Sequence, residues 1–319
     1  MKILVTGGAG FIGSHLSEKL LEMGHEVFII DNLWTGKLEN LSKIQNHKRL
    51  HIFIENILNE SVMNELIFKV DHVYHLAAAV GVRNIMDNPV ETLDINVKGT
   101  EMVLRLANRF KKKVFIASTS EIYGKHLDHS LSENDNRVMG PVKKRRWAYA
   151  CSKTLDEFFA LAYYDEKKLP VVIGRLFNTV GPRQTGQYGM VLPTFVQSAL
   201  LEKPLTVYGD GNQTRSFAHV YDVTDAIIKL MNERKAEGDI FNIGNDNEVT
   251  INDLALKVKQ MTGSVSDIEH ISYEKAYGPG FEDMERRCPN IDKIRKLIGF
   301  KPLNDLDAII QDVIEYFKE

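Results

Sequence analysis

The sequence is poor in cysteine and has no marked excess of charge of either sign. Its 319 residues include two cysteines, Cys151 and Cys288, which are too few for a disulfide framework and lack the paired spacing of a zinc site. The 40 basic and 43 acidic residues nearly balance, and the formal net charge is −3. This balance excludes the strongly basic surface typical of proteins that bind nucleic acid or anionic membranes. We therefore expect a small-molecule partner.

Long apolar runs are also absent from the sequence. No run approaches the ~18 residues that span a bilayer, and the opening MKILVTGGAG has no apolar signal core behind a basic leader. The histidines form no metal-ligand set, because His72 and His75 lie three apart in one predicted strand and face opposite ways. We therefore expect a soluble cytoplasmic protein that binds no metal.

What the sequence does contain is an alternation of apolar strand and helix patterns. Strands are predicted at residues 2–6, 27–31, 50–55, 72–76, 113–117 and 171–175, and helices at 11–23, 60–68, 91–111 and 147–168. This order predicts an α/β fold, a doubly wound parallel sheet of the Rossmann type with helices on both faces.

The pattern changes after residue 177, where loop-rich sequence surrounds one helix near 192–202. We predict that residues 218–243 return to the main sheet. The predicted domains are 1–177 plus 218–243, which bind a dinucleotide, and 178–217 plus 244–319, a smaller α/β domain that binds the substrate.

Glycines lie between the first predicted strand and the first predicted helix. Gly7, Gly10 and Gly13 permit a tight turn and let backbone N–H groups and the helix N-terminus approach a pyrophosphate. Asp31 ends the second strand, 18 residues after Gly13, where a carboxylate accepts hydrogen bonds from ribose hydroxyls and repels a 2′-phosphate. The motif therefore predicts NAD in preference to NADP.

The GxxGxxG spacing resembles that of the extended short-chain dehydrogenase/reductase family, most of whose members act on nucleotide sugars. The resemblance covers nearly the whole chain and implies further NAD contacts. These are Phe11 and Ile12 in the glycine loop, Asn32, Thr35 and Gly36 at the adenosine ribose, Asn56 and Ile57 at the adenine, and Leu76, Ala77, Ala78 and Ser118 along the cofactor. The family usually has aspartate at the position of Asn56.

A tyrosine and a lysine share one face of a predicted helix. Tyr149 and Lys153 lie four residues apart, and Ser118–Glu121 directly follow the fifth predicted strand at the ligand-binding edge of the sheet. With Thr119 they resemble the catalytic set of the family. Removal of a hydride from an alcohol needs a base for the hydroxyl proton, so Tyr149 is the expected base. We expect the Lys153 ammonium and the nicotinamide to lower its pKa, and Thr119 to hydrogen-bond the reacting oxygen.

Two segments distinguish reactions within the family. Thr119, Ser120 and Glu121 resemble the TSE motif of UDP-glucuronate decarboxylases, a motif that GDP-mannose dehydratases share. Arg287 matches the arginine of an R-x-P segment in the same decarboxylases, and a guanidinium suits a substrate carboxylate. The basic run Lys143–Arg146 is interpreted as a solvated loop and is left outside the site.

The resemblance also implies a UDP-sugar site and a homodimer. Asn178, in the segment Arg175–Asn178, is expected at the diphosphate, Val207 and Tyr208 at the uracil, and Arg215 at the phosphates. The helices at 91–111 and 147–168 are expected to form a four-helix interface between two copies.

The leading hypothesis is NAD-dependent decarboxylation of UDP-glucuronate through oxidation at C4, which gives UDP-xylose or a UDP-4-keto-pentose. A 4-epimerase acting on UDP-glucuronate or UDP-glucose is the first alternative, and a nucleotide-sugar 4,6-dehydratase is the second. A catalytically idle NAD sensor has no need of the Tyr149 and Lys153 pair and is least favoured.

Overall fold

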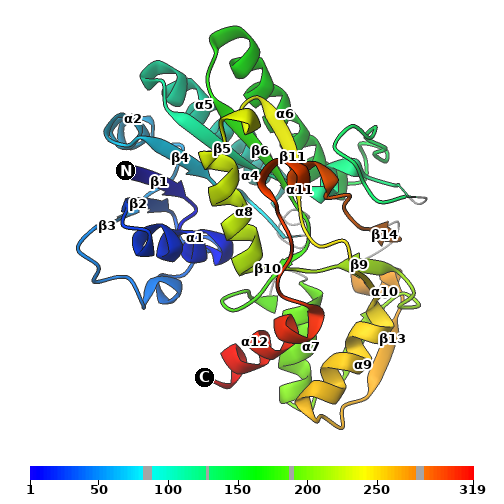
Figure 1. Ribbon diagram of the computed structural model, residues 1–319. Coiled ribbons are helices and arrows are strands. Elements are labelled where there is room, and N and C mark those ends of the chain that lie inside the picture. The colour runs from blue at the N-terminus through cyan, green and yellow to red at the C-terminus, as the bar shows by residue number, and fades with distance from the viewer. Residues whose placement is uncertain (82–87, 127–128, 187–189, 278–283) are drawn as a thin grey trace.

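Seven parallel strands form the main sheet of the computed structural model, which describes residues 1–81, 88–126, 129–186, 190–277 and 284–319 (Figure 1). Their order is β11-β6-β5-β4-β1-β2-β3. The strands are β1 (Lys2–Thr6), β2 (Glu26–Asp31), β3 (Leu50–Ile54), β4 (His72–His75), β5 (Lys113–Thr119), β6 (Val171–Leu176) and β11 (Asp239–Ile243). The predicted doubly wound sheet is confirmed, including the return of the chain to it before residue 243.

Helices cover both faces of this sheet because successive strand side chains point to opposite sides. Ile3 and Val5 of β1 share one core with α1 (Phe11–Glu22) and α8 (Val220–Asn232). Leu4 belongs to the other core, with α2 (Glu60–Lys69), α5 (Gly99–Phe110) and α6 (Arg146–Lys167). Within the described residues, no helix is both long enough and apolar enough to cross a membrane.

The helix predicted at 91–111 is a continuous helical run in three parts. It consists of α4 (Pro89–Leu93), a π-helical segment (Asp94–Lys98) and α5. In the π-helical segment, Asn96 accepts a hydrogen bond from the backbone N–H of Ala79 at 2.8 Å and donates one to Ser152 Oγ at 3.2 Å. The wider turn thereby anchors the chain after β4, where the sequence predicted cofactor contacts.

A second group of elements lies below the sheet in Figure 1. The helices α7 (Val191–Leu200), α9 (Ile251–Thr262) and α12 (Leu306–Lys318) enclose a separate core with β8 (Leu205–Tyr208). β8 pairs with β13 (Ile268–Ile271), and β7 (Thr179–Val180) pairs with β10 (Ala218–His219). β9 (Thr214–Ser216) lies between β12 (Glu248–Thr250) and β14 (Arg286–Arg287), and the short helix α10 is Tyr273–Tyr277.

The C-terminal region contributes to both cores. Ile291, Ile294 and Phe300, in and around α11 (Asp292–Ile298), lie in the core of the main sheet, whereas Ile309 of α12 lies in the second core. The predicted division into 1–177 plus 218–243 and 178–217 plus 244–319 stays a prediction. Residues 291–300 pack with the first of these parts, because the apolar face of α11 is turned toward the main sheet.

Candidate active site

A cavity of about 660 Å³ opens at the carboxyl ends of β1, β4 and β5 and extends to β8 and β9. The strand order reverses between β1 and β4, which is where doubly wound sheets bind ligands. The predicted site residues that line this cavity are Gly7, Gly10, Phe11, Ile12, Gly13, Asp31, Asn32, Thr35, Asn56, Ile57, Leu76, Ala77, Ala78, Ser118, Thr119, Ser120, Glu121, Tyr149, Asn178, Tyr208, Arg215 and Arg287. Gly36, Lys153 and Val207 are not among the lining residues.

The glycine loop leaves room for a pyrophosphate beside α1. Gly7 has φ of 70°, and a Cβ at this position would lie 2.8 Å from the backbone nitrogen of Ala77. A Cβ on Gly13 would lie 2.1 Å from the carbonyl oxygen of Gly7, so only glycine allows the helix to start this close to the loop. Within the described part of the chain, no side chain caps α1. Its first N–H groups therefore suit an anionic group such as the pyrophosphate of NAD.

Asp31 ends β2 beside this loop with its carboxylate fixed in place. Its Oδ2 accepts from the Ala9 N–H at 3.0 Å, and its Oδ1 accepts from the Leu33 N–H at 2.8 Å. Burial raises the pKa of this carboxyl, and the backbone hydrogen bonds oppose that rise. Gly36 packs directly against Asp31, because a Cβ there would lie 2.9 Å from either carboxylate oxygen. The site therefore holds an acceptor suited to ribose hydroxyls.

Asp31→Ala is expected to weaken NAD binding about tenfold and to reduce the preference of the protein for NAD over NADP. The change removes the acceptors for the ribose hydroxyls and the charge that repels a 2′-phosphate. Titration of the purified protein with each cofactor measures both effects. Asp31→Asn keeps the shape of the side chain and isolates the contribution of charge. Equal affinity of the unchanged protein for NAD and NADP would refute the assignment.

Tyr149 and Lys153 lie one turn apart near the start of α6. Tyr149 lines the cavity and is hydrogen-bonded with Thr119. The Lys153 ammonium instead donates to Asp156 Oδ2 at 2.6 Å, and both of these side chains are almost completely buried. Lys153 therefore belongs to a buried ion pair beneath the cavity.

The pKa of Tyr149 differs from the expectation. Burial raises it above its usual range, the negative charges of Glu121 and Asp156 raise it further, and the hydrogen bond with Thr119 opposes them. In the chain alone the Lys153 ammonium is paired with Asp156 and does not offset this rise, and the expected lowering in the presence of nicotinamide stays a prediction. The chain alone therefore favours the protonated phenol, and the action of Tyr149 as a base depends on the positive charge of a bound nicotinamide, which the sequence analysis also invoked.

Glu121 lies between two arginines at the cavity wall. Its Oε1 accepts from Arg287 Nη1 at 2.7 Å, and its Oε2 accepts from Arg146 Nη2 at 3.1 Å. Glu121 belongs to the short 3₁₀-helix Ser120–Tyr123 that follows β5, and Arg287 is presented by the pairing of β14 with β9. The fold thus brings together Glu121 and Arg287, which are 166 residues apart in the chain.

Arg146 is a cavity residue that the sequence analysis left out. Its position in the run Lys143–Arg146 suggested a solvated loop, but it is the first residue of α6 and is only 7% exposed. Its guanidinium carbon lies 5.2 Å from the centre of the Trp147 ring. The available signal was spacing, because a residue three positions before Tyr149 on the same helix shares its face.

The far end of the cavity contains the predicted nucleotide residues, with one correction. Val207 is completely buried in the second core, and alternation along β8 places Thr206 and Tyr208 on the cavity side instead. Asn178 Nδ2 donates to the carbonyl of Ser216 at 2.8 Å, which fixes Asn178 against β9. Further lining residues that the sequence did not reveal include Trp34, Gln184, Gln213 and Tyr273.

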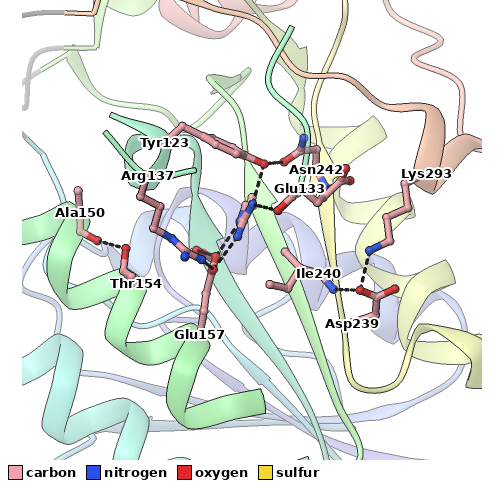
Figure 2. A network of polar contacts seen from close by, with 12 residues as sticks. Tyr123, Glu133, Arg137, Ala150, Thr154, Glu157, Asp239, Ile240, Asn242 and Lys293 are labelled. Carbon is pink, nitrogen blue, oxygen red and sulfur yellow. Dashed lines mark hydrogen bonds and ion pairs between the residues drawn. The ribbon is translucent and has the colours of Figure 1, made fainter. Parts of the chain in front are cut away.

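A buried polar network supports the site from behind (Figure 2). Arg175 is only 2% exposed, and its Nε and Nη2 donate to the two carboxylate oxygens of Glu157, each at 2.9 Å. Glu157 also accepts from Arg137 at 2.9 Å and from Ser118 Oγ at 2.6 Å. Figure 2 shows Glu157 pointing toward Arg137, with Tyr123 nearby. Arg175, in the segment expected at the nucleotide, is therefore an internal residue that joins β6 to α6.

Arg175→Met is expected to destabilise the fold by about 3–5 kcal/mol, because it leaves the buried Glu157 carboxylate with half of its hydrogen bonds lost. Urea unfolding followed by circular dichroism measures the change. Arg175→Met combined with Glu157→Leu removes both charges and should recover part of the loss. A decrease in the free energy of unfolding below about 1 kcal/mol, the scale of an exposed ion pair, would contradict the role of Arg175 as a buried structural residue.

A comparison with models of protein families identifies the family of this chain. The family model described as GDP-mannose 4,6 dehydratase matches residues 4–313. The chain belongs to this family. Within the described part of the chain, no group of three or more His, Cys, Asp or Glu residues is placed to hold a metal ion. Membership in the GDP-mannose 4,6 dehydratase family confirms the predicted resemblance to extended short-chain dehydrogenases/reductases.

Named relatives carry several activities. UDP-N-acetyl-alpha-D-glucosaminuronate decarboxylase of Bacillus cytotoxicus is 42% identical over 319 residues, which cover 100% of this chain and 98% of the relative. UDP-glucuronic acid decarboxylase 1 of Xenopus tropicalis is 36% identical over 318 residues, which cover 100% of this chain and 72% of the relative. The crystal structure of UDP-glucuronic acid 4-epimerase from Bacillus cereus, in complex with UDP-glucuronic acid and NAD, aligns with a TM-score of 0.90 at 29% identity over 100% of this chain and 99% of that one.

Proposed function

We propose that this protein is an NAD-dependent decarboxylase of a UDP-hexuronate, with UDP-glucuronate as the expected substrate and UDP-xylose or a UDP-4-keto-pentose as the product. The observation that carries the proposal is the Arg287–Glu121 contact beside Tyr149, in a cavity that begins at a dinucleotide loop. The relatives at 42% and 36% identity, both named as decarboxylases of UDP-linked uronates, support it over the epimerase and dehydratase alternatives.

The first step is oxidation of the sugar at C4. The glycine loop would hold NAD by its pyrophosphate and Asp31 would hold it by its ribose, and NAD bound there would supply the hydride acceptor for C4. Tyr149 takes the proton of the C4 hydroxyl, and Thr119 donates a hydrogen bond to the same oxygen. The buried Lys153–Asp156 pair fixes the face of α6 that presents Tyr149.

The second step is the loss of carbon dioxide from the resulting β-keto acid. The bond between C5 and the carboxyl carbon breaks, and its electron pair moves toward the C4 oxygen. C5 then takes up a proton from water, which balances the proton that was removed from the C4 hydroxyl. Tyr149 and Thr119 stabilise the charge that develops on that oxygen. Arg287 orients the carboxylate, while Ser120 and Glu121 shape this side of the sugar. Orientation matters more than neutralisation, because a strong salt bridge to the carboxylate would oppose its departure.

Product analysis tests the proposal. The purified protein is incubated with NAD and UDP-glucuronate, and in parallel with UDP-N-acetylglucosaminuronate, and the products are followed by mass spectrometry and NMR. Release of carbon dioxide from either substrate supports the decarboxylase. Unchanged mass with inversion at C4 would establish the epimerase, loss of water would establish the dehydratase, and no turnover would favour an NAD-binding protein without catalysis.

We also propose that two copies associate through α4 and α6. Leu155 and Phe158 on α6 are 41% and 59% exposed, and Val90 and Leu93 on α4 are 74% and 39% exposed. Sedimentation at micromolar concentration is expected to show a dimer, and Phe158→Glu should dissociate it. Leu256→Glu, at a 57% exposed residue of α9, serves as the matched control. Sedimentation that detects only the 36.3 kDa species would contradict the dimer.

The proposed compartment is the cytoplasm. Cys151 is an exposed free thiol and Cys288 is a buried one. Exposed free thiols persist where the surroundings are reducing, which supports the assignment.

A further inference from the structure

A buried ion pair on α6 lies beneath the cavity. The Lys153 ammonium donates to Asp156 Oδ2 at 2.6 Å, and the two side chains are 2% and 0% exposed. Tyr149 lines the cavity, whereas Lys153 and Asp156 are not among the lining residues. Water therefore screens the pair poorly, and the loss of one partner leaves the other charge unbalanced.

Lys153 has a polar neighbour on each side of it along the helix. Tyr149 lies four residues before it and Asp156 three residues after it, so side chains at all three positions can meet on one face. In the chain alone the ammonium is bound to Asp156, and the Tyr149 hydroxyl is hydrogen-bonded with Thr119. Asp156 thus compensates a positive charge that lies one turn from the phenol.

The Asp156 carboxylate is part of a chain of buried polar groups. Burial raises the pKa of this carboxyl, and the Lys153 ammonium and the Thr100 hydroxyl of α5 oppose that rise. Thr100 Oγ1 also lies 3.2 Å from His75 Nε2, and His75 Nδ1 lies 2.8 Å from Thr6 Oγ1. The chain extends from α6 to the ends of β4 and β1, so the position of the carboxylate is fixed by the main sheet.

The other ionisable groups around the pair are neutral or have partners of their own. Burial and the Lys153 ammonium lower the pKa of His75 to about 3, so this imidazole is uncharged. Glu157 and Glu121 are each bound to two arginines. The charged residues of the remaining segments that pack on α6 are exposed or paired with an opposite charge: Glu91 of α4, Asp94 and Lys98 of the π-helical segment, Glu101, Arg105 and Arg109 of α5, and Lys113 of β5.

We propose that Asp156 is a positioning residue, which holds the Lys153 ammonium below the cavity and sets the lower end of the pH range in which Tyr149 accepts a proton. Asp156 acts through Lys153, because it cancels most of the positive charge that would otherwise favour the phenolate. Without Asp156, the flexible stem of Lys153 lets the ammonium turn toward Tyr149. This inference rests on the proposed function, in which Tyr149 is the base.

Titration of Tyr149 in the holoenzyme tests the inference without a substrate. Each protein is the full chain saturated with NAD, and phenolate formation is followed by ultraviolet absorbance. The same titration of the matching protein that carries Tyr149→Phe is subtracted, so that the difference reports the ionisation of Tyr149 alone.

Asp156→Asn is expected to lower the midpoint of this titration by about one pH unit, because it removes a negative charge and keeps the shape of the side chain. The acid limb of NADH formation with UDP-glucuronate should move to lower pH by the same amount, since the base is then available at lower pH. Asp165→Asn removes the same charge from an exposed residue of the same helix and should leave the midpoint unchanged.

The same substitution in a protein that carries Lys153→Met separates an effect through Lys153 from a direct one. A buried carboxyl without an ammonium beside it takes up a proton, so Asp156 is already neutral in that background. Asp156→Asn should therefore shift the midpoint there by less than about 0.3 pH unit. Circular dichroism establishes that each variant is folded. The double variant contains neither buried charge, and its midpoint should lie within about half a pH unit of that of the unchanged protein even if Asp156→Asn alone does not fold.

Three results would overturn the inference. An unchanged midpoint in Asp156→Asn would show that the pair does not control Tyr149, and an equal shift in the Lys153→Met background would show that Asp156 does not act through Lys153. Failure of Tyr149 to ionise in any of the folded proteins would reject it as the base. The titration does not depend on whether carbon dioxide is released, so failure of the decarboxylase assignment is detected separately by product analysis.

Discussion

Tyr149→Phe is expected to abolish the first oxidation, with a loss of at least ~1,000-fold in turnover. The substitution removes one oxygen, the proposed acceptor of the C4 hydroxyl proton, and leaves the aromatic ring in α6. Thr119 loses its hydrogen bond with the phenol and keeps the one from the Glu121 N–H, and the Lys153–Asp156 pair does not involve the phenol oxygen. Appearance of NADH in a single turnover with UDP-glucuronate measures the step directly.

Binding should survive this change. NAD and UDP affinities are expected to stay within about threefold of the unchanged protein, because the glycine loop and the β8–β9 end of the cavity are untouched. Lys153→Met is the companion variant, since it removes the ammonium from beneath the cavity without touching the proposed base. Near-normal turnover in Tyr149→Phe would show that another group accepts the proton.

Arg287→Ala is expected to reduce the formation of carbon dioxide by at least ~100-fold, the scale of about 2.7 kcal/mol for a misplaced reacting group. The alanine cannot orient the carboxylate, and Glu121 loses its shorter ionic contact. The backbone pairing of β14 with β9 does not depend on the side chain, so the local fold should persist. Carbon dioxide release is compared with the rate of C4 oxidation in the same sample.

The comparison of the two steps decides the role of Arg287. A carboxylate-orienting residue should slow the loss of carbon dioxide more than it slows oxidation at C4. Arg286→Ala is the control, because Arg286 is paired with Glu248 on the other side of β14 and does not line the cavity. Decarboxylation at the unchanged rate in Arg287→Ala, together with a similar result in Glu121→Gln, would remove the basis for the decarboxylase.

Most of the main sheet could be predicted because its signals are local. The strands of a buried parallel sheet are short continuous apolar runs, and every one predicted ends within two residues of its observed position. The glycine loop was equally accessible, since Gly13 is required by a close backbone contact with Gly7 in the same short segment. Asp31 follows from the same unit, because β2 pairs directly with β1.

The misses arose where tertiary contacts override local pattern. A basic run is usually solvated, and only the arrival of Glu121 from the end of β5 shows that Arg146 turns inward. The pKa of Tyr149 depends on Asp156, a buried partner for Lys153 that the spacing of Tyr149 and Lys153 does not reveal. The family resemblance placed Val207 at the ligand, and the short strand β8 gives no sign of which alternate residues face the second core.

The segment that carries Arg287 is attached on two sides. On one side the Thr214 N–H, at the start of β9, donates to the carbonyl of Glu285 at 2.9 Å. On the other side, the Leu131 N–H donates to the carbonyl of Cys288 at 2.8 Å, and the Asn290 N–H donates to the carbonyl of Leu131 at the same distance. Residues 285–290 therefore crosslink the strand next to the proposed nucleotide site to the loop that follows the catalytic strand.

The position of Arg287 depends on both of these attachments. If β9 were displaced from β5, either the hydrogen bonds to Leu131 or the contact of Arg287 with Glu121 would have to break. A substitution that weakens either attachment would therefore disturb Arg287 without touching its side chain.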